Sequence, residues 1–168
     1  DTVSKLSRYA AMIGSNIRII GEPKTIDNDL VHTDHTPGFG SAARYVASTV
    51  REITLDASVY EKKSVTIVEI MGRHAGWLTA AASLASITGE APDLIYLPER
   101  NFDMDKFLSD VERIYKEKGN CMVAVSEGIH YADGTFVSEA KTSATDGFGH
   151  AQLGGLAVML ADTVKQAT

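Results

Sequence analysis

The densest group of reactive side chains in the 168-residue sequence lies at residues 23–29, which read PKTIDND. Two of them, Asp27 and Asp29, are carboxylates two residues apart. Such a pair can divide a group transfer, because one carboxylate can accept a proton from an attacking hydroxyl while the other holds Mg²⁺. Lys24 can neutralise phosphate charge beside them, and Thr25 adds a hydroxyl. The same residue types also build Asx turns, so a turn and a site both remain open at this point.

A second candidate follows the apolar segment that ends at Ile70. Met71, Gly72 and Arg73 come directly after it and before a stretch expected to be helical. Backbone N–H groups and a guanidinium at such a junction can both face an anion. The competing interpretation is that Arg73 covers the helix N-terminus or pairs with Glu69, and a single Gly-Arg pair does not decide between them.

Glu127 is the third candidate. It follows the apolar residues 121–125 and precedes Gly128. A carboxylate at a strand end can accept hydrogen bonds from sugar hydroxyls, and a solvated loop carboxylate is the alternative.

Other kinds of site find less support. His32 and His35 have no Cys or third His near enough in sequence to complete a tetrahedral zinc set. Cys121 lies in an apolar run, which is typical of a buried structural thiol. Trp77 precedes a stretch rich in alanine, and this pattern predicts a core residue rather than a stacking platform.

Length and composition limit the class of protein. The 18.0 kDa chain fits one domain and has 44% hydrophobic and 23% charged residues, a balance typical of globular proteins. Lys and Arg number 16 against 22 Asp and Glu, and the net charge of −6 argues against nucleic-acid binding. No apolar run approaches the roughly 20 residues that cross a bilayer, and the first residues show no secretory signal pattern. We therefore expect a cytoplasmic protein that binds neither nucleic acid nor membrane.

Hydrophobic periodicity predicts helices that alternate with short apolar strands. Residues 65–70 are rich in β-branched side chains, and Asp103 and Gly119 are suited to the two caps of one helix. Residues 17–20 are predicted to form a buried strand. The predicted strands are 17–20, 65–70, 94–97 and 121–125, and the predicted helices are about 3–13, 38–57, 75–85, 103–119 and 153–166.

This alternation predicts a mainly parallel sheet with right-handed crossovers, covered by helices in a three-layer α/β/α sandwich. In such sheets ligands bind beyond the carboxyl ends of the strands. The loops that contain Asp27, Arg73 and Glu127 each follow a predicted strand. We therefore expect the three side chains to meet at one edge of the sheet.

Taken together and in this order, three motifs resemble the phosphofructokinase family: PKTIDND at 23–29, VEIMGR at 68–73 and SEG at 126–128. The resemblance covers nearly the whole chain and implies a phosphofructokinase-like fold. It also implies a phosphoryl transfer to the 1-hydroxyl of fructose 6-phosphate, which gives fructose 1,6-bisphosphate. Positioning and electrostatic stabilisation carry most of the catalysis in such reactions.

The resemblance assigns catalytic roles to four residues. It makes Asp27 the general base that takes the proton of the 1-hydroxyl, and Asp29 a ligand of the Mg²⁺ cofactor. Thr25 would contact the transferred phosphoryl group or the substrate. Arg73 would stabilise the negative charge of that group.

The resemblance also concerns the binding of the two substrates. The backbone of Met71 and Gly72 and the carboxylate of Glu127 would hold the sugar. Lys24 bears on the phosphoryl donor, because many ATP-dependent members have Gly there, whereas pyrophosphate-dependent members typically have Lys. Pyrophosphate is therefore the expected donor, and an ATP-dependent enzyme is the alternative.

The resemblance further predicts how the chain divides. Residues 1–37 would be the end of a donor-binding region with the catalytic Asp loop, and residues 38–168 a fructose 6-phosphate-binding region truncated at its C-terminal side. Family members are considerably longer, so we expect a fragment, inactive alone, of a homo-oligomeric enzyme. A non-catalytic regulatory subunit that binds a sugar phosphate is the alternative from another functional class.

Overall fold

The computed structural model describes residues 2–89, 91–138 and 155–167. In chain order its elements are α1 (Thr2–Met12), α2 (Phe39–Ser58), β1 (Ser64–Ile70), α3 (Trp77–Ala81), the 3₁₀ helix η1 (Ala82–Thr88), β2 (Leu94–Tyr96), α4 (Met104–Lys118), β3 (Asn120–Ser126) and α5 (Leu156–Ala167). The predicted start of the last helix, at residue 153, lies outside the described residues. Within those ranges no helix combines the length and the apolar character needed to cross a membrane.

The three strands form one parallel sheet in the order β1-β3-β2. Val65 lies opposite Cys121 and Leu94 opposite Val123, so the central strand β3 is paired on both sides. A strand that is paired on both edges and covered on both faces has no solvent-facing side, and residues 121–126 are all buried. The predicted parallel sheet is confirmed, and Cys121 is a buried thiol as expected.

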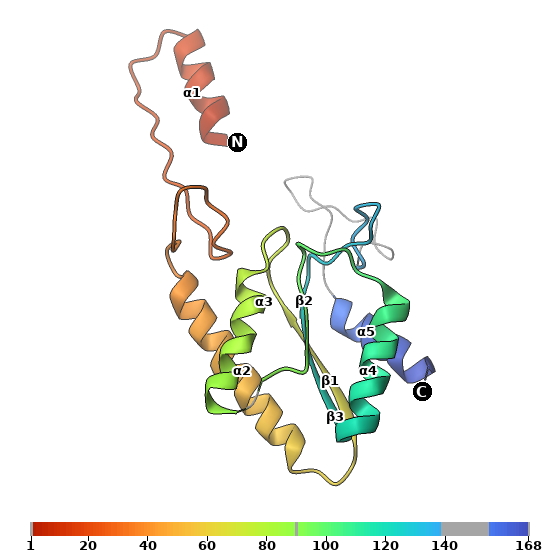
Figure 1. Ribbon diagram of the computed structural model, residues 1–168. Coiled ribbons are helices and arrows are strands. Elements are labelled where there is room, and N and C mark those ends of the chain that lie inside the picture. Colours follow the sequence, from red (N-terminus) through yellow and green to blue (C-terminus); the bar gives the residue numbers. More distant parts are fainter. Residues whose placement is uncertain (1, 90, 139–154, 168) are drawn as a thin grey trace.

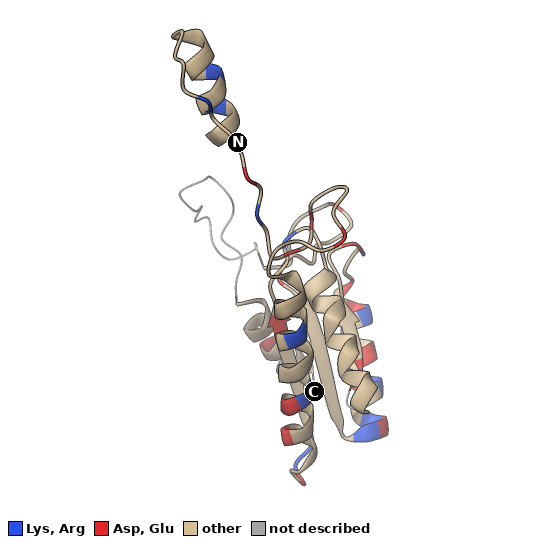
Figure 2. Ribbon diagram, turned by 90° about the vertical axis from the view of Figure 1, so that its left-hand side faces the viewer, with Lys and Arg blue, Asp and Glu red and all other residues tan. Residues whose placement is uncertain are grey.

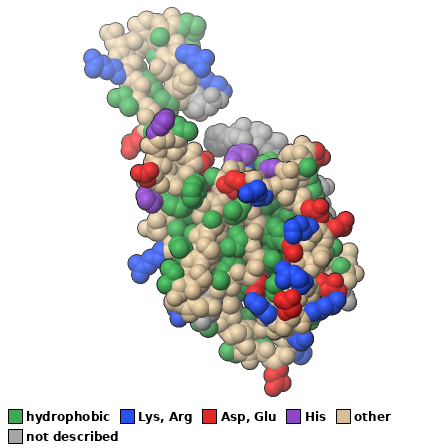
Figure 3. Space-filling view, viewed as in Figure 1, with side chains coloured by type: hydrophobic (Ala, Val, Ile, Leu, Met, Phe, Trp, Pro, Cys, Tyr) green, Lys and Arg blue, Asp and Glu red, His purple; other side chains and the backbone are tan. Residues whose placement is uncertain are grey.

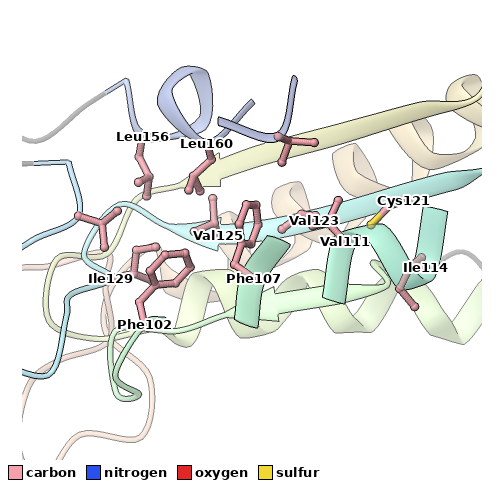
Figure 4. Packing of buried hydrophobic residues seen from close by; sticks show 12 residues of the cluster. Phe102, Phe107, Val111, Ile114, Cys121, Val123, Val125, Ile129, Leu156 and Leu160 are labelled. Atoms are coloured by element: carbon pink, nitrogen blue, oxygen red, sulfur yellow. The ribbon is translucent and has the colours of Figure 1, made fainter. Parts of the chain in front are cut away.

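Alternate residues of β3 face opposite helical layers, as the pleat of a strand requires. Val123 and Val125 pack with Phe107 of α4 and Leu160 of α5 in one hydrophobic cluster (Figure 4). Ala124 packs in a second cluster with residues of α2, α3 and η1. The sheet therefore lies between two helical layers (Figure 1), and the predicted three-layer α/β/α sandwich is confirmed.

Helix α4 begins and ends at the residues that the sequence predicts as caps. The Asp103 carboxylate accepts a hydrogen bond from the N–H of Lys106 at 2.9 Å, which satisfies one N–H group that the first turn leaves without an intrahelical partner. At the other end Gly119 has a φ of 85°, and its N–H donates to the carbonyl of Tyr115. The chain then enters β3 directly.

The apolar stretch 75–85 forms two short helices, α3 and η1, where one helix was expected. Ala82 is fully buried, but Trp77 is 56% exposed, so the predicted core position of Trp77 is wrong. The physical reason is that α3 packs into the core through Leu78 and Ala81, whereas Trp77, its first residue, lies outside that cluster. There it lines a hollow of about 480 Å³ together with Asp29 and Phe39.

Helix α1 forms where a helix is predicted, but the segment that follows it differs most from expectation. Residues 17–20 are in no strand, and Ile17 and Ile20 are 72% and 87% exposed. The predicted buried strand is wrong because a strand needs a neighbour for its N–H and C=O groups, and no described residue pairs with this segment. Helix α1 also lies apart from the sheet, as both ribbon views show (Figures 1 and 2).

Candidate active site

Two of the predicted groups meet where β1 and β3 end side by side. The N–H of Glu127 donates to the carbonyl of Ile70 at 2.9 Å. The Glu127 carboxylate accepts a hydrogen bond from the N–H of Gly72 at 3.2 Å, and the Ser126 hydroxyl donates to the Gly72 carbonyl at 2.6 Å. Both polar backbone groups of Gly72 are therefore bound by the end of β3. Acidic, basic and histidine side chains gather at this end of the molecule (Figure 3).

Close backbone packing joins the same two segments. Gly72 has a φ of 136°, and a Cβ atom there would lie 2.5 Å from the carbonyl oxygen of Ala75. A Cβ atom on Gly128 would lie 1.9 Å from the carbonyl oxygen of Arg73. Real side chains do not fit at such distances, so both positions require glycine. The backbone of Arg73 is thereby fixed relative to the Glu127 turn.

The aspartate loop is organised by its neutral polar residues. The N–H of Asp27 donates to Oγ1 of Thr25 at 3.1 Å. Asn28 has a φ of 59°, accepts a hydrogen bond from the N–H of Thr36 at 2.9 Å, and donates to the carbonyl of Asp34 at 3.1 Å. Thr25 and Asn28 thus form the turn that one interpretation expects, and the site interpretation of Asp27 and Asp29 stays a prediction. Oδ1 of Asp27 is buried and has no hydrogen-bond partner in the described part of the chain.

The environment of Asp27 favours its protonated form. Burial raises the pKa of this carboxyl above its usual value, and the negative charges of Asp29 and Glu127 raise it further. The carboxylates of Asp29 and Glu127 therefore both lie close enough to act on Asp27, although Glu127 is about one hundred residues away in sequence. A carboxylate with a raised pKa is suited to accept a proton during a reaction.

The remaining predicted residues lie on the aspartate loop and on the turn that Glu127 contacts. Arg73 is half-buried, and Lys24 is exposed on the segment that leads into the aspartate loop. The Met71 side chain is 53% exposed and lines an apolar hollow of about 390 Å³ beside β1. Ile26 and Tyr45 line the same hollow, so the aspartate loop and the Met71 turn lie on the same side of β1.

Glu99, which belongs to none of the three sequence motifs, also contacts the turn that carries Arg73. Its carboxylate accepts a hydrogen bond from the N–H of Gly76 at 2.7 Å, three residues after Arg73. A positional signal was present, because Glu99 follows one predicted strand as Glu127 follows another. Both acidic residues therefore lie at the same edge of the sheet.

The described residues contain no group of three or more His, Cys, Asp or Glu side chains arranged to hold a metal ion. Mg²⁺, however, is usually bound by one or two carboxylates, while waters and substrate phosphates complete its shell. The exposed carboxylate of Asp29, beside Asp27, meets that smaller requirement. The donor set of Asp29 and Asp27 thus fits Mg²⁺.

Comparison with known proteins gives a match to the family described as Phosphofructokinase over residues 1–167. The chain is 53% identical, over 169 aligned residues, to a pyrophosphate–fructose 6-phosphate 1-phosphotransferase of Xanthomonas campestris pv. campestris, covering 99% of this chain and 40% of that protein. It is 38% identical to a sulfofructose kinase of Alkalicoccus urumqiensis, covering 96% of this chain and 41% of that protein. The chain thus spans about two-fifths of the length of these curated relatives.

Solved structures show the same likeness. A pyrophosphate-dependent phosphofructokinase from Marinobacter aquaeolei has a TM-score of 0.72 and 39% identity, covering 99% of this chain and 38% of that one. The phosphofructokinase of Saccharomyces cerevisiae has a TM-score of 0.58 and 27% identity, covering 98% of this chain and 20% of that one. The phosphofructokinase-like fold expected from the three motifs is confirmed, and the chain belongs to the phosphofructokinase family.

Proposed function

We propose that the protein of which this chain is a part transfers a phosphoryl group from pyrophosphate to the 1-hydroxyl of fructose 6-phosphate. The observation that carries this proposal is the Asp27 carboxyl, which has a buried oxygen without a hydrogen-bond partner among the described residues. Its raised pKa and its place near Glu127 and Asp29 suit a general base. The printed name of the Xanthomonas relative supports the choice of substrates.

Asp27 acts as the general base in this reaction. Its carboxylate accepts the proton of the 1-hydroxyl as the hydroxyl oxygen attacks the terminal phosphorus of pyrophosphate. A bond forms between the sugar oxygen and that phosphorus, and the bond from phosphorus to the bridging oxygen breaks. Fructose 1,6-bisphosphate and inorganic phosphate are the products.

Arg73 and Thr25 contact the phosphoryl group that is transferred. The Arg73 guanidinium stabilises the charge on the phosphoryl oxygens, and the fixed backbone at Gly72 and Gly128 sets the direction from which it approaches. Oγ1 of Thr25 accepts the N–H of Asp27, which leaves its own O–H to donate to a phosphoryl oxygen or to the substrate.

Glu127 holds the sugar on the other side of the site. One of its carboxylate oxygens accepts the N–H of Gly72, and the other is left to accept hydrogen bonds from sugar hydroxyls. The backbone of Met71 and Gly72 borders the same place. The hydrogen bond to Gly72 orients the Glu127 carboxylate before the sugar binds.

Asp29 is the residue that we assign to the Mg²⁺ cofactor. The ion supplies positive charge to the donor phosphates when it is bound.

Lys24 supports pyrophosphate as the donor, because an ammonium beside the aspartate loop neutralises a small second phosphate and crowds a nucleotide. The assignment of residues 1–37 to the donor side and residues 38–168 to the sugar side follows from these roles. A homo-oligomeric parent and a cytoplasmic location belong to the same proposal.

A donor test on the full-length parent decides the proposal. We expect fructose 1,6-bisphosphate to form from fructose 6-phosphate, Mg²⁺ and pyrophosphate, and Lys24→Gly to raise the KM for pyrophosphate. Turnover with ATP alone would keep the acceptor and overturn the donor. Binding of fructose 6-phosphate without turnover from either donor would instead identify a regulatory subunit.

A further inference from the structure

The turn that carries Arg73 is held at both ends by carboxylates. At its start, Glu127 from the end of β3 accepts the N–H of Gly72 at 3.2 Å. At its far end, Glu99 from beyond β2 accepts the N–H of Gly76 at 2.7 Å. Arg73 lies between these two bonds. Because β2 and β3 are neighbouring strands of one sheet, the two bonds connect the turn to a rigid base.

The contact between Glu99 and Gly76 is closely packed. A Cβ atom on Gly76 would lie 2.6 Å from Oε2 of Glu99, 2.9 Å from Cδ of Pro98 and 3.0 Å from Cδ2 of Leu97. Gly76 is buried, and the segment that follows β2 therefore lies directly against its backbone. The carboxylate reaches an N–H group at the start of the short helix α3, which the helix itself cannot pair.

We propose that Glu99 is a positioning residue for Arg73, an inference that rests on the proposed function. Glu99 holds the far end of the turn, and this sets the place of the Arg73 guanidinium over the transferred phosphoryl group. Glu127 alone cannot do this, since it fixes only the near end of the turn and also faces the sugar. Glu99 acts through Arg73 and does not touch the substrate.

The side chain of Arg73 is long, so the position of its guanidinium depends on the angle of the backbone that carries it. Without Glu99 the N–H of Gly76 loses this acceptor, and the far end of the turn loses the hydrogen bond that connects it to the segment after β2. A displacement of about 1 Å at a reacting group can cost roughly 10² in rate. We therefore expect the loss to appear mainly in kcat, because the charge that Arg73 stabilises is largest in the transition state.

The test is a double-mutant cycle in the full-length parent, assayed with fructose 6-phosphate, pyrophosphate and Mg²⁺. We expect Glu99→Ala to lower kcat by about 10-fold to 100-fold. Glu99→Gln should stay within about threefold of wild type, because an amide oxygen accepts the same hydrogen bond. In an Arg73→Ala background, Glu99→Ala should have little further effect. The matched control is Glu112→Ala, which removes an exposed glutamate that pairs with Lys116 on α4.

The outcomes separate the two proposals. An inactive wild-type parent overturns the proposed function. An active parent in which Glu99→Ala costs the same factor with and without Arg73, or in which Glu99→Gln is as impaired as Glu99→Ala, overturns the role of Glu99. If Glu99→Ala does not fold, Glu99→Asp replaces it, because a side chain one methylene shorter keeps the charge but does not reach Gly76. Wild-type kcat in that variant would also overturn the inference.

Discussion

Replacing Gly128 by alanine is expected to disable the site from a position that touches no substrate. The new Cβ atom would lie 1.9 Å from the carbonyl oxygen of Arg73, whereas ordinary van der Waals contact begins at 3.4 Å. The two turns must therefore separate by about 1.5 Å, the difference between these distances. Both turns are backbone held by hydrogen bonds, so no flexible side chain can absorb the shift.

The magnitude of the loss follows from this separation. A misplacement of about 1 Å near reacting groups costs roughly 10² in rate, so we expect kcat/KM to fall by about 100-fold or more. Overpacking of this kind also costs about 1–3 kcal/mol of stability, which should lower the melting temperature without abolishing folding.

The assay compares steady-state kinetics and thermal unfolding of the full-length parent with those of its Gly128→Ala variant. The matched control is Gly40→Ala in α2, where an added Cβ atom has no neighbour within 4 Å and φ is not positive. Alanine is favoured over glycine inside a helix by about 1 kcal/mol, so the control should be active and at least as stable as wild type. A Gly128→Ala variant with kcat/KM within about threefold of wild type would refute the packing argument.

Three further outcomes are expected of the full-length parent. Asp27→Asn should lower kcat by about 10²–10⁴ or more, with the KM for fructose 6-phosphate changed far less, and near-wild-type turnover would remove Asp27 as the base. Because the base must be ionised, activity should fall as the pH drops through the raised pKa of Asp27. Glu127→Gln removes a negative charge that raises this pKa, so the fall in activity should move to lower pH. A fall at the same pH in the pH–rate profile of the variant would contradict the effect of Glu127 on Asp27. Asp103→Ala should cost about 1 kcal/mol in denaturant unfolding through the lost cap of α4 and leave kcat unchanged.

The parts of the fold that sequence reasoning predicts best are those with local causes. The caps of α4 are an example, since Asp103 and Gly119 act within a few residues of their own positions. The segment 17–20 shows the opposite case. Its β-branched, apolar composition is suited to a strand, but a strand exists only with a partner, and no described residue supplies one. Trp77 is a similar case, because its burial depends on which residues of α3 face the core, and those are Leu78 and Ala81.

The same distinction applies to the residues of the candidate site. Arg73 and Glu127 follow β1 and β3, and the parallel topology brings the ends of these two strands together. Asp27 lies near Glu127 although residues 17–20 form no strand, so its place does not follow from the topology. Glu99 shares with Glu127 a place after a predicted strand, but the roles of Glu99 and Gly128 depend on distances to Gly76 and Arg73 that only the folded chain defines. Such supporting contacts join residues far apart in sequence and have no periodic signature.

The charges of the site bear on the cofactor. The carboxylates of Asp29 and Glu127 are close enough to raise the pKa of Asp27, and Arg73 and Lys24 are the predicted cationic residues of the site. Pyrophosphate and a sugar phosphate are both anionic, so their approach to a site with this balance is opposed by Coulomb repulsion. A divalent cation beside Asp29 would reverse that balance where the donor phosphates bind, without neutralising Asp27, which must stay free to take the proton. The arrangement of carboxylates is thus a physical reason for assigning Mg²⁺ to Asp29 in the proposed reaction.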